Sequence, residues 1–369
     1  MQNQGFNCFL PTMQVQKLRN QKVQTITEPM FSRYLFIQLD DQTQNWGPIR
    51  STLGVSKLVS FGPQPAKVPP DFIAFLKEAP PETLERMFAP GDSEKKMTKA
   101  MEGNADIALF DLEDAVTPEN KPMARALVHD FLKANAAHRA RLWVRINPFD
   151  GPYTLADLAA IMPAHPGGIM LPKVYGRADV DKLDHCLSAL EVANGIEEGS
   201  TPVIVLVTET AEAMFHTGSY KGAPRVVALT WGAEDLADSI GASSNRDADG
   251  SYSFTYELAR SLTVLGAATA GVAAIETISA DYKDLEALRL RAEKVRRDGF
   301  RGMLAIHPAQ VDVINAAFTP SAEEVAEARE IVAIFDANPG VGAIGYKGGM
   351  LDRPYLSRAL QLLAQVDPA

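Results

Sequence analysis

Acidic and basic side chains recur at the ends of short apolar runs in this chain. The groups that could do chemistry at six of these run ends are Asp111, Glu113, Asp114, Arg145, Asn147, Lys173, Glu209, Glu234, Asp235 and His307. One carboxylate at a strand end usually caps the following helix, but that explanation weakens when many strand ends carry a charged group. Converging carboxylates repel each other unless a cation lies between them, and oxygen ligands suit Mg²⁺. Arg145 opposite them would suit an anionic substrate or a developing enolate.

The elements that must position these groups alternate regularly. The apolar runs are 86–90, 107–112, 141–146, 168–174, 202–208, 225–231, 272–278 and 302–307, and the amphipathic stretches include 120–134, 178–193, 256–270 and 284–297. Nearly continuous apolar strands are typical of a parallel sheet covered on both faces. Eight strands alternating with helices predict an α/β fold, a (β/α)8 TIM barrel, with an open doubly wound sheet as the alternative. Because active residues of such barrels lie at the carboxyl ends of the strands, we expect the charged groups to share one rim.

The chain divides into four predicted parts. Glutamines are dense near the start, and the proline-rich stretches 63–70 and 79–81 are typical of connections. We predict a first segment over 1–78, a linker over 79–85, a barrel domain over 86–320 and a C-terminal extension over 321–369. In the extension, Ser321 should cap a helix over 322–335, followed by a glycine-rich loop and a short helix after Pro354.

Several function classes are excluded or disfavoured by composition. The 369 residues carry a net charge of −10, which argues against nucleic-acid binding through bulk charge. The two cysteines, Cys8 and Cys186, lack the spacing of a zinc site or disulfide framework. No apolar run is long enough for a membrane span and no signal segment is visible, so we expect a cytoplasmic protein. The GxGxxG match at 340–345 follows a predicted helix and opens none, so it is not a dinucleotide site. For His307 we favour a structural role over a site role.

A series of motifs runs in order along residues 86–366. They are Asp111-Leu-Glu-Asp-Ala-Val116, Trp143-Val-Arg-Ile-Asn147, Met170-Leu-Pro-Lys173, Thr208-Glu-Thr-Ala211, Trp231-Gly-Ala-Glu-Asp-Leu236, Ser243-Ser-Asn-Arg246, Ile306-His-Pro308 and Gly349-Met-Leu-Asp352. This set resembles the citrate lyase β-subunit-like (CitE-like) family of the HpcH/HpaI aldolase superfamily of CoA-ester lyases. The resemblance implies a TIM barrel, a Mg²⁺ ion and an acyl-CoA substrate.

Residue roles are implied by the same resemblance. Glu209 and Asp235 match metal ligands, and Glu113 and Asp114 match residues that hold metal-bound waters. Arg145 matches the group that faces the thioester oxygen.

Further positions carry implied roles in substrate binding and proton transfer. Asp352 matches a catalytic aspartate on a lid that reaches the active site of a neighbouring subunit, which implies a homo-oligomer, a trimer or hexamer. Lys173 and Arg246 match motif positions that we assign to substrate binding. The backbone N–H groups around Gly232 and Ala233 could hold the carboxylate of an oxoacid.

The implied reaction is carbon–carbon cleavage of a 3-hydroxyacyl-CoA. Citryl-, malyl- or citramalyl-CoA would give acetyl-CoA and a 2-oxoacid, with the metal lowering the hydroxyl pKa and Arg145 stabilising the enolate. Asp352 would protonate the enolate carbon, or remove that proton in the condensing direction. An acyl-CoA thioesterase using the same site is an alternative.

The first segment has a separate resemblance. Gly5-Phe-Asn-Cys-Phe-Leu-Pro11, Glu28-Pro-Met-Phe-Ser-Arg-Tyr-Leu-Phe36, Ile49-Arg-Ser-Thr-Leu-Gly-Val55 and Phe61-Gly-Pro-Gln-Pro-Ala66 resemble the α+β N-terminal domain of NusG-type elongation factors, closer to the RfaH-like branch. The opening strand, most of the first helix and the following KOW domain of that family are absent. We therefore favour a truncated remnant over a working RNA-polymerase-binding module. A working module would make the protein a transcription elongation or antitermination factor, which is the alternative.

Overall fold

The computed structural model describes six short strands between residues 7 and 65 and the continuous stretch 86–366, with side chains described from residue 87. The chain forms two compact units, one of residues 83–319 and one that combines residues 1–82 with 320–369. The linker predicted over 79–85 lies wholly outside the described residues.

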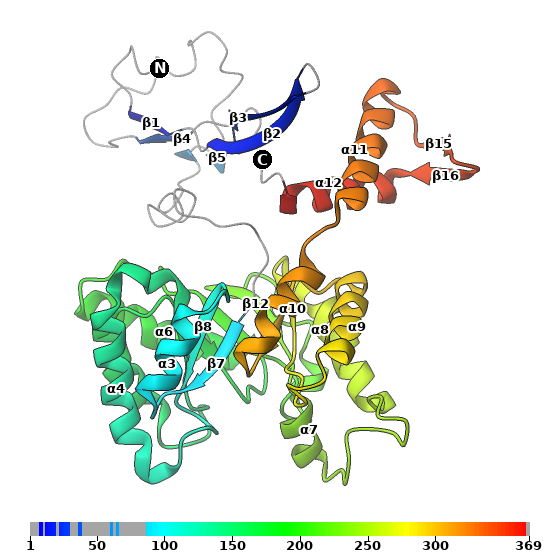
Figure 1. Ribbon diagram of the computed structural model, residues 1–369. Coiled ribbons are helices and arrows are strands. Elements are labelled where there is room, and N and C mark those ends of the chain that lie inside the picture. Colours follow the sequence, from blue (N-terminus) through cyan, green and yellow to red (C-terminus); the bar gives the residue numbers. More distant parts are fainter. Residues whose placement is uncertain are drawn as a thin grey trace. The chain divides into compact units, whose positions relative to one another are not determined.

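The first of these units contains a closed barrel of eight parallel strands (Figure 1). The strands are β7 (Arg86–Pro90), β8 (Ile107–Asp111), β9 (Leu142–Arg145), β10 (Gly168–Leu171), β11 (Val203–Leu206), β12 (Val226–Thr230), β13 (Ala273–Glu276) and β14 (Gly302–Ala305). Each strand pairs with its sequence neighbours, and β14 closes the barrel by pairing with β7. The TIM barrel predicted from the sequence is confirmed, with most strands one to three residues shorter at their ends than their apolar runs.

Helices connect consecutive strands and cover the outside of the barrel (Figure 1). They are α3 (Glu94–Glu102), α4 (Lys121–Ala134), α5 (Thr154–Ile161), α6 (Arg177–Ala193), α7 (Ala233–Ile240), α8 (Phe254–Ala270), α9 (Leu285–Asp298) and α10 (Pro308–Phe318). After β11 the connection holds only a 3-10 turn over Ala213–Phe215, whereas β12 is followed by both α7 and α8. None of the helices in the described part of the chain is long and apolar enough to cross a membrane.

The alternation of side chains along each strand produces two apolar layers. The barrel interior is filled by a small cluster that includes Leu109, Trp143 and Met170, while the larger cluster lies between strands and helices. A Cβ at Gly168 would lie 2.5 Å from the Trp143 ring, so the indole fills the space that a side chain on β10 would need. The interior is therefore a packed core, which leaves the strand ends as the place for a site.

The C-terminal extension folds around a core of its own. Helices α11 (Ala322–Ala337) and α12 (Arg353–Val366) pack with the hairpin of β15 (Ala343–Tyr346) and β16 (Gly349–Asp352). The predicted cap of α11 is present, since Ser321 Oγ accepts from Glu324 N at 3.2 Å. The expected glycine-rich loop is wrong in detail, because Lys347 and Gly348 both take positive φ and so form the two-residue turn of a hairpin.

The N-terminal segment is described only as paired strands. β1 (Asn7–Phe9) pairs with β4 (Phe36–Gln38), β2 (Thr12–Arg19) with β3 (Lys22–Pro29), and β5 (Ser60–Phe61) with β6 (Gln64–Pro65), all antiparallel. The remaining residues of the NusG-like resemblance lie outside the described part of the chain.

Candidate active site

A cavity of about 760 Å³ opens at the carboxyl ends of the barrel strands. Its charged and polar lining comprises Lys96, Lys99, Asp111, Arg145, Glu209, Glu234, Asp235, Thr277 and His307, together with the backbone at Gly232 and Ala233. Apolar side chains that include Phe88, Leu206 and Ile306 line the remainder. Six of the ten strand-end groups named from the sequence therefore line one cavity. The cavity is large enough for a small-molecule ligand.

Arg145 is held rigidly at the end of β9. Its Nε and Nη2 donate to the two carboxylate oxygens of Asp111 at 2.7 and 2.6 Å, and its Nη1 lies 2.9 Å from Glu113 Oε2. Burial raises the pKa of the Asp111 carboxyl, but the Arg145 guanidinium outweighs it and the pKa is lowered. The guanidinium lies over the Phe88 ring, 5.0 Å from its centroid. A fork bound at both ends and stacked on a ring has little freedom, so its remaining N–H groups keep a fixed direction.

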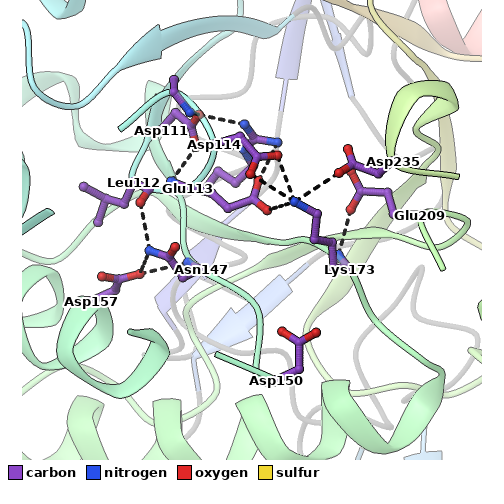
Figure 2. Close-up of polar contacts among 12 residues, drawn as sticks. Asp111, Leu112, Glu113, Asp114, Asn147, Asp150, Asp157, Lys173, Glu209 and Asp235 are labelled. Atoms are coloured by element: carbon purple, nitrogen blue, oxygen red, sulfur yellow. Dashed lines mark hydrogen bonds and ion pairs between the residues drawn. The ribbon is translucent and has the colours of Figure 1, made fainter. Parts of the chain in front are cut away.

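Lys173 joins three acidic side chains, two from the loop after β8 and one from the first turn of α7 (Figure 2). Its Nζ lies 2.5 Å from Glu113 Oε1, 2.8 Å from Asp114 Oδ2 and 3.0 Å from Asp235 Oδ1. Burial lowers the pKa of Lys173, but the hydrogen bonds to Asp114 and Glu113 raise it by more. The net effect is a raised pKa, so the side chain is an ammonium ion.

Glu209 is a buried acid of the rim with a strongly raised pKa. It is only 3% exposed, and it accepts a 2.7 Å hydrogen bond from the Lys173 backbone N–H. Its pKa is raised well above the ordinary value of 4.5, first by burial and then by the neighbouring charges of Asp235 and Glu113. Figure 2 shows the carboxyl groups of Glu209 and Asp235 side by side. A Cβ at Gly232 would lie 2.9 Å from Glu209 Cγ, so a residue without a side chain is needed for this packing.

A buried polar layer supports the loop that follows β8. Lys121 Nζ donates to the carbonyl oxygens of Leu112 and Glu113 and to Asn147 Oδ1, at 2.8–3.1 Å. Asn147 in turn donates to Asp157 Oδ2 from both its backbone N–H and its side chain. These bonds fix the backbone that presents Glu113 and Asp114, because every member of the layer has a partner.

Arg246, one of the predicted site residues of the barrel unit, does not line the cavity. Arg246 is exposed in the loop between α7 and α8, where it lies over the Tyr252 ring at 4.1 Å and donates to the Gly250 carbonyl. Asp352 belongs to β16 in the other unit of the chain. Arg145, Glu209, Gly232, Ala233 and Asp235 line the cavity. Glu113, Asp114 and Lys173 are not lining residues but are joined to Arg145 and Asp235 by ion pairs.

His307 has structural contacts as well as a place in the cavity lining. Its Nδ1 accepts from Ala309 N at 3.2 Å as part of the capping box of α10, and its ring stacks on Tyr282 with centroids 4.7 Å apart. The structural role favoured from the sequence accounts for these contacts.

Sequence reasoning missed the basic residues of the cavity mouth. Lys96 and Lys99 lie on α3, the first helix of the barrel, and both line the cavity. Their spacing of three residues places them on one face of a helix that follows a barrel strand. That spacing was a usable signal, but it carries no acid–base motif and was overlooked. The polar layer around Lys121 and Asn147 was missed because its partners lie far apart in the sequence.

Comparison with known families gives two separate matches. Residues 85–308 match the model described as HpcH/HpaI aldolase/citrate lyase. Residues 1–77 match the model described as Transcription termination factor nusG. Both resemblances drawn from the sequence motifs are thereby confirmed.

Individual relatives cover nearly all of the chain beyond its first segment. The L-malyl-CoA/beta-methylmalyl-CoA lyase of Cereibacter sphaeroides is 31% identical, over 79% of this chain and 98% of its own. A (3S)-malyl-CoA thioesterase of the same organism is 31% identical, over 76% of this chain and 93% of its own. A crystal structure of CitE from Mycobacterium tuberculosis in complex with magnesium, acetoacetate and coenzyme A is 32% identical, with a TM-score of 0.65, and the match covers 77% of this chain and 98% of that one.

Proposed function

Because the chain belongs to the HpcH/HpaI aldolase/citrate lyase family and is a lyase, we propose that it cleaves or forms a carbon–carbon bond in a 3-hydroxyacyl-CoA such as citryl-, malyl- or citramalyl-CoA. The reaction depends on Mg²⁺ and yields acetyl-CoA and a 2-oxoacid in the cleaving direction. The observation that carries this proposal is the pairing of Glu209 and Asp235 in a cavity that also presents Arg145. Relatives named as malyl-CoA lyase and a CitE complex with magnesium and coenzyme A support it.

The donor set of the rim fits Mg²⁺. The residues that the structure describes contain no group of three or more histidines, cysteines or acids arranged to hold a metal. Mg²⁺ needs no such cage, since it is commonly bound by one or two carboxylates and keeps several waters. Glu209 and Asp235 supply two carboxylates, and burial together with the charges of Asp235 and Glu113 raises the pKa of Glu209. Bound at this pair, the ion would polarise the substrate's carboxylate and hydroxyl oxygens and lower the hydroxyl pKa.

Arg145 has the donors to stabilise an enolate. A guanidinium carries five N–H groups, and the hydrogen bonds to Asp111 use two of them, while Nη1 lies 2.9 Å from Glu113 Oε2. Arg145 lines the cavity, so its remaining N–H groups could donate to a substrate oxygen there. As the carbon–carbon bond breaks, its electron pair moves onto the thioester and negative charge develops on the thioester oxygen. Fixed N–H donors stabilise that charge more than the neutral ground state, which lowers the barrier.

The two ends of the substrate have matching surfaces. Helix α7 begins at Ala233, so the N–H groups at Gly232 and Ala233 are suited to a carboxylate. Lys96 and Lys99 supply positive charge for the phosphates of coenzyme A. The cavity thus offers one anion site beside the acidic pair and another on α3.

The proton for the enolate carbon comes from Asp352 of a neighbouring subunit in this proposal, so the enzyme works as a homo-oligomer, a trimer or hexamer. Asp352 Oδ1 is shielded from solvent and has no hydrogen-bond partner among the residues that the structure describes. A buried, unpaired carboxyl oxygen is costly, and the role in a neighbour's site would give it a partner.

The proposal is tested by metal-dependent turnover of a substrate panel. The full-length protein is incubated with citryl-, malyl- and citramalyl-CoA in Mg²⁺ or EDTA, and mass spectrometry follows acetyl-CoA and the 2-oxoacid. We expect both products only with Mg²⁺, and a loss of at least about 10³-fold in kcat in the Glu209→Ala/Asp235→Ala variant. The matched control Glu119→Ala/Asp130→Ala removes two exposed acids and should retain wild-type turnover.

Two outcomes would contradict the lyase. Wild-type turnover in the Glu209→Ala/Asp235→Ala variant would rule out Glu209 and Asp235 as the metal ligands. Free coenzyme A together with the intact hydroxy acid, without equimolar acetyl-CoA, would identify the thioesterase instead, which the relative named as a malyl-CoA thioesterase makes the second candidate.

A further inference from the structure

Lys173 is connected to the acidic rim in two independent ways. Its backbone N–H donates to Glu209 Oε2 at 2.7 Å, whereas its ammonium group contacts Glu113, Asp114 and Asp235. One residue therefore touches both proposed metal ligands, Glu209 through the main chain and Asp235 through the side chain. The two connections can separate, because the backbone and the end of a long side chain move independently.

The charges of the rim make the ammonium group a substitute for a metal ion. Five carboxylates gather there, those of Asp111, Glu113, Asp114, Glu209 and Asp235. Among the described residues, the cations that form ion pairs with these acids are Arg145 and Lys173. Arg145 is committed to Asp111 and Glu113. In the described part of the chain, Asp235 forms its ion pair with Lys173.

The main chain at Lys173 shows that the arrangement is held in place. Its φ is +48°, in the left-handed region that is unfavourable for residues other than glycine. A strained backbone persists only where surrounding contacts require it. The hydrogen bond to buried Glu209 is such a contact. The side chain is 23% exposed, and its ammonium group contacts buried Glu113 as well as the more exposed Asp114 and Asp235. The backbone contact is thus the fixed one, and the contact with Asp235, which is 30% exposed, is the movable one.

We propose that Lys173 is a built-in competitor for the divalent metal: its ammonium group neutralises Asp235 in the metal-free protein and leaves that carboxylate when the metal binds, while its backbone N–H keeps Glu209 in position. This inference rests on the proposed function, because it takes Glu209 and Asp235 as the metal ligands. A cation 3.0 Å from Asp235 Oδ1 and a divalent ion on the same carboxylate repel each other. The side chain therefore lowers metal affinity and keeps the empty site from collapsing through repulsion among the acids.

Mn²⁺ binding measured by electron paramagnetic resonance tests the competition without any need for turnover. In the Lys173→Met variant, we expect Mn²⁺ to bind at least about tenfold more tightly than in the wild type. The Lys173→Arg variant keeps the charge and should stay within about threefold of the wild type. The matched control Lys133→Met removes an exposed lysine at the end of α4 and should not change Mn²⁺ affinity. Unchanged or weaker binding in Lys173→Met would overturn the inference, since a residue that only organises the acids would weaken binding when lost.

A second measurement uses the wild-type protein and does not depend on a variant that folds. In a crystal structure with Mn²⁺ bound, we expect the separation between Lys173 Nζ and Asp235 Oδ1 to lengthen from 3.0 Å to beyond hydrogen-bond distance. A contact that persists beside bound metal would overturn the competition. The failure of the proposed function looks different, because Mn²⁺ would then bind equally well to the wild type and to Glu209→Ala/Asp235→Ala.

Discussion

Two buried glutamates at opposite ends of the barrel strands are treated very differently by the fold. Glu191 and Glu209 are 0% and 3% exposed. Glu191, near the amino ends of the strands, pairs with Arg225 Nη1 at 2.6 Å and accepts N–H bonds from Gly199 and Thr201 at 2.8 and 2.9 Å. Glu209, at the carboxyl ends, accepts a hydrogen bond from Lys173 N and lies near two further acids.

The pKa values of the two carboxyl groups shift in opposite directions. Burial raises the pKa of Glu191, but bonds from Arg225, Thr201 and Gly199 outweigh burial and the pKa is lowered. Burial and the charges of Asp235 and Glu113 together raise that of Glu209. A buried charge with all its hydrogen bonds becomes strongly destabilising only when a partner is removed, whereas a buried acid with a strongly raised pKa marks a place where a ligand is expected. The amino ends of the strands are therefore built for stability and the carboxyl ends for chemistry.

The strongest test of this comparison removes Arg225, the cation of the satisfied end. Arg225 also contacts Asp184 and Ser188, and its side chain is only 3% exposed. In Arg225→Met, Glu191 would be left as a buried charge without its ion-pair partner, so we expect the free energy of unfolding to fall by roughly 3–5 kcal/mol. Urea denaturation measures this loss.

Activity provides the contrast for Arg225. The kcat per folded molecule should stay at the wild-type value, because Arg225 directly precedes β12 and the site lies at the other end of that strand. A large fall in kcat with little change in stability in Arg225→Met would contradict the assignment of stability to the amino ends of the strands and of chemistry to the carboxyl ends.

A smaller effect is expected from adding one methyl group at each end. In Gly232→Ala the new Cβ would meet Glu209 Cγ at 2.9 Å, so overpacking should cost roughly 1–3 kcal/mol of stability. In Gly199→Ala nothing lies within 4 Å of the new Cβ, but a φ of +86° makes the backbone unfavourable for alanine, at roughly 1–2 kcal/mol. Both variants lose stability in urea denaturation.

Metal affinity separates these two variants. Only Gly232→Ala displaces a proposed ligand, so only its Mn²⁺ affinity should fall, by roughly 10–100-fold. Equal Mn²⁺ affinity in Gly232→Ala and the wild type would show that Glu209 is not a ligand or can move without loss.

The barrel and much of its rim were predictable from the sequence, because both depend on local patterns. Continuous apolar runs identify the strands of a parallel sheet, and the rule that sites lie at strand carboxyl ends brings Glu113, Arg145 and Glu209 together without a structure. The capping box at Ser321 is equally local. The motif resemblances to both families were also sufficient, since both families match in the expected ranges.

What escaped prediction depends on contacts between distant residues. The ammonium group of Lys173 contacts carboxylates 59, 60 and 62 positions away in the sequence. No local sequence pattern shows that Lys173 pairs with these acids instead of contacting the substrate. Lys121 and Asn147 are buried by tertiary packing, which overrides the general preference of such residues for the surface. The hairpin at 343–352 was mistaken for a loop because its strands are only four residues each and glycines lie in and around them. The domain boundaries, the proposed site roles and the role of Asp352 stay predictions.

The smallest expected effect is a pair of opposite slopes in stability against pH, measured by urea denaturation in EDTA. The folded state holds the Glu209 proton more tightly than the unfolded chain, so unfolding releases it at pH values between the ordinary 4.5 and the raised pKa. The free energy of unfolding should therefore fall as pH rises above 4.5, by no more than about 1.4 kcal/mol per pH unit for one group. Glu191, with a lowered pKa, gives stability that is present above 4.5 and is lost as pH falls below that value.

Single substitutions assign each slope to its glutamate. Glu209→Gln should remove the fall above pH 4.5, and Glu191→Gln should remove the loss below it, because a neutral amide does not titrate in either state. Asp111 also has a lowered pKa and adds to the acid-side loss, so the Glu191→Gln curve should retain part of it. A fall above 4.5 that survives in Glu209→Gln would move that titration to Glu113, whose pKa burial also raises. The raised pKa would still lie at the carboxyl ends, but on a residue held by both Arg145 and Lys173 rather than on the proposed metal ligand.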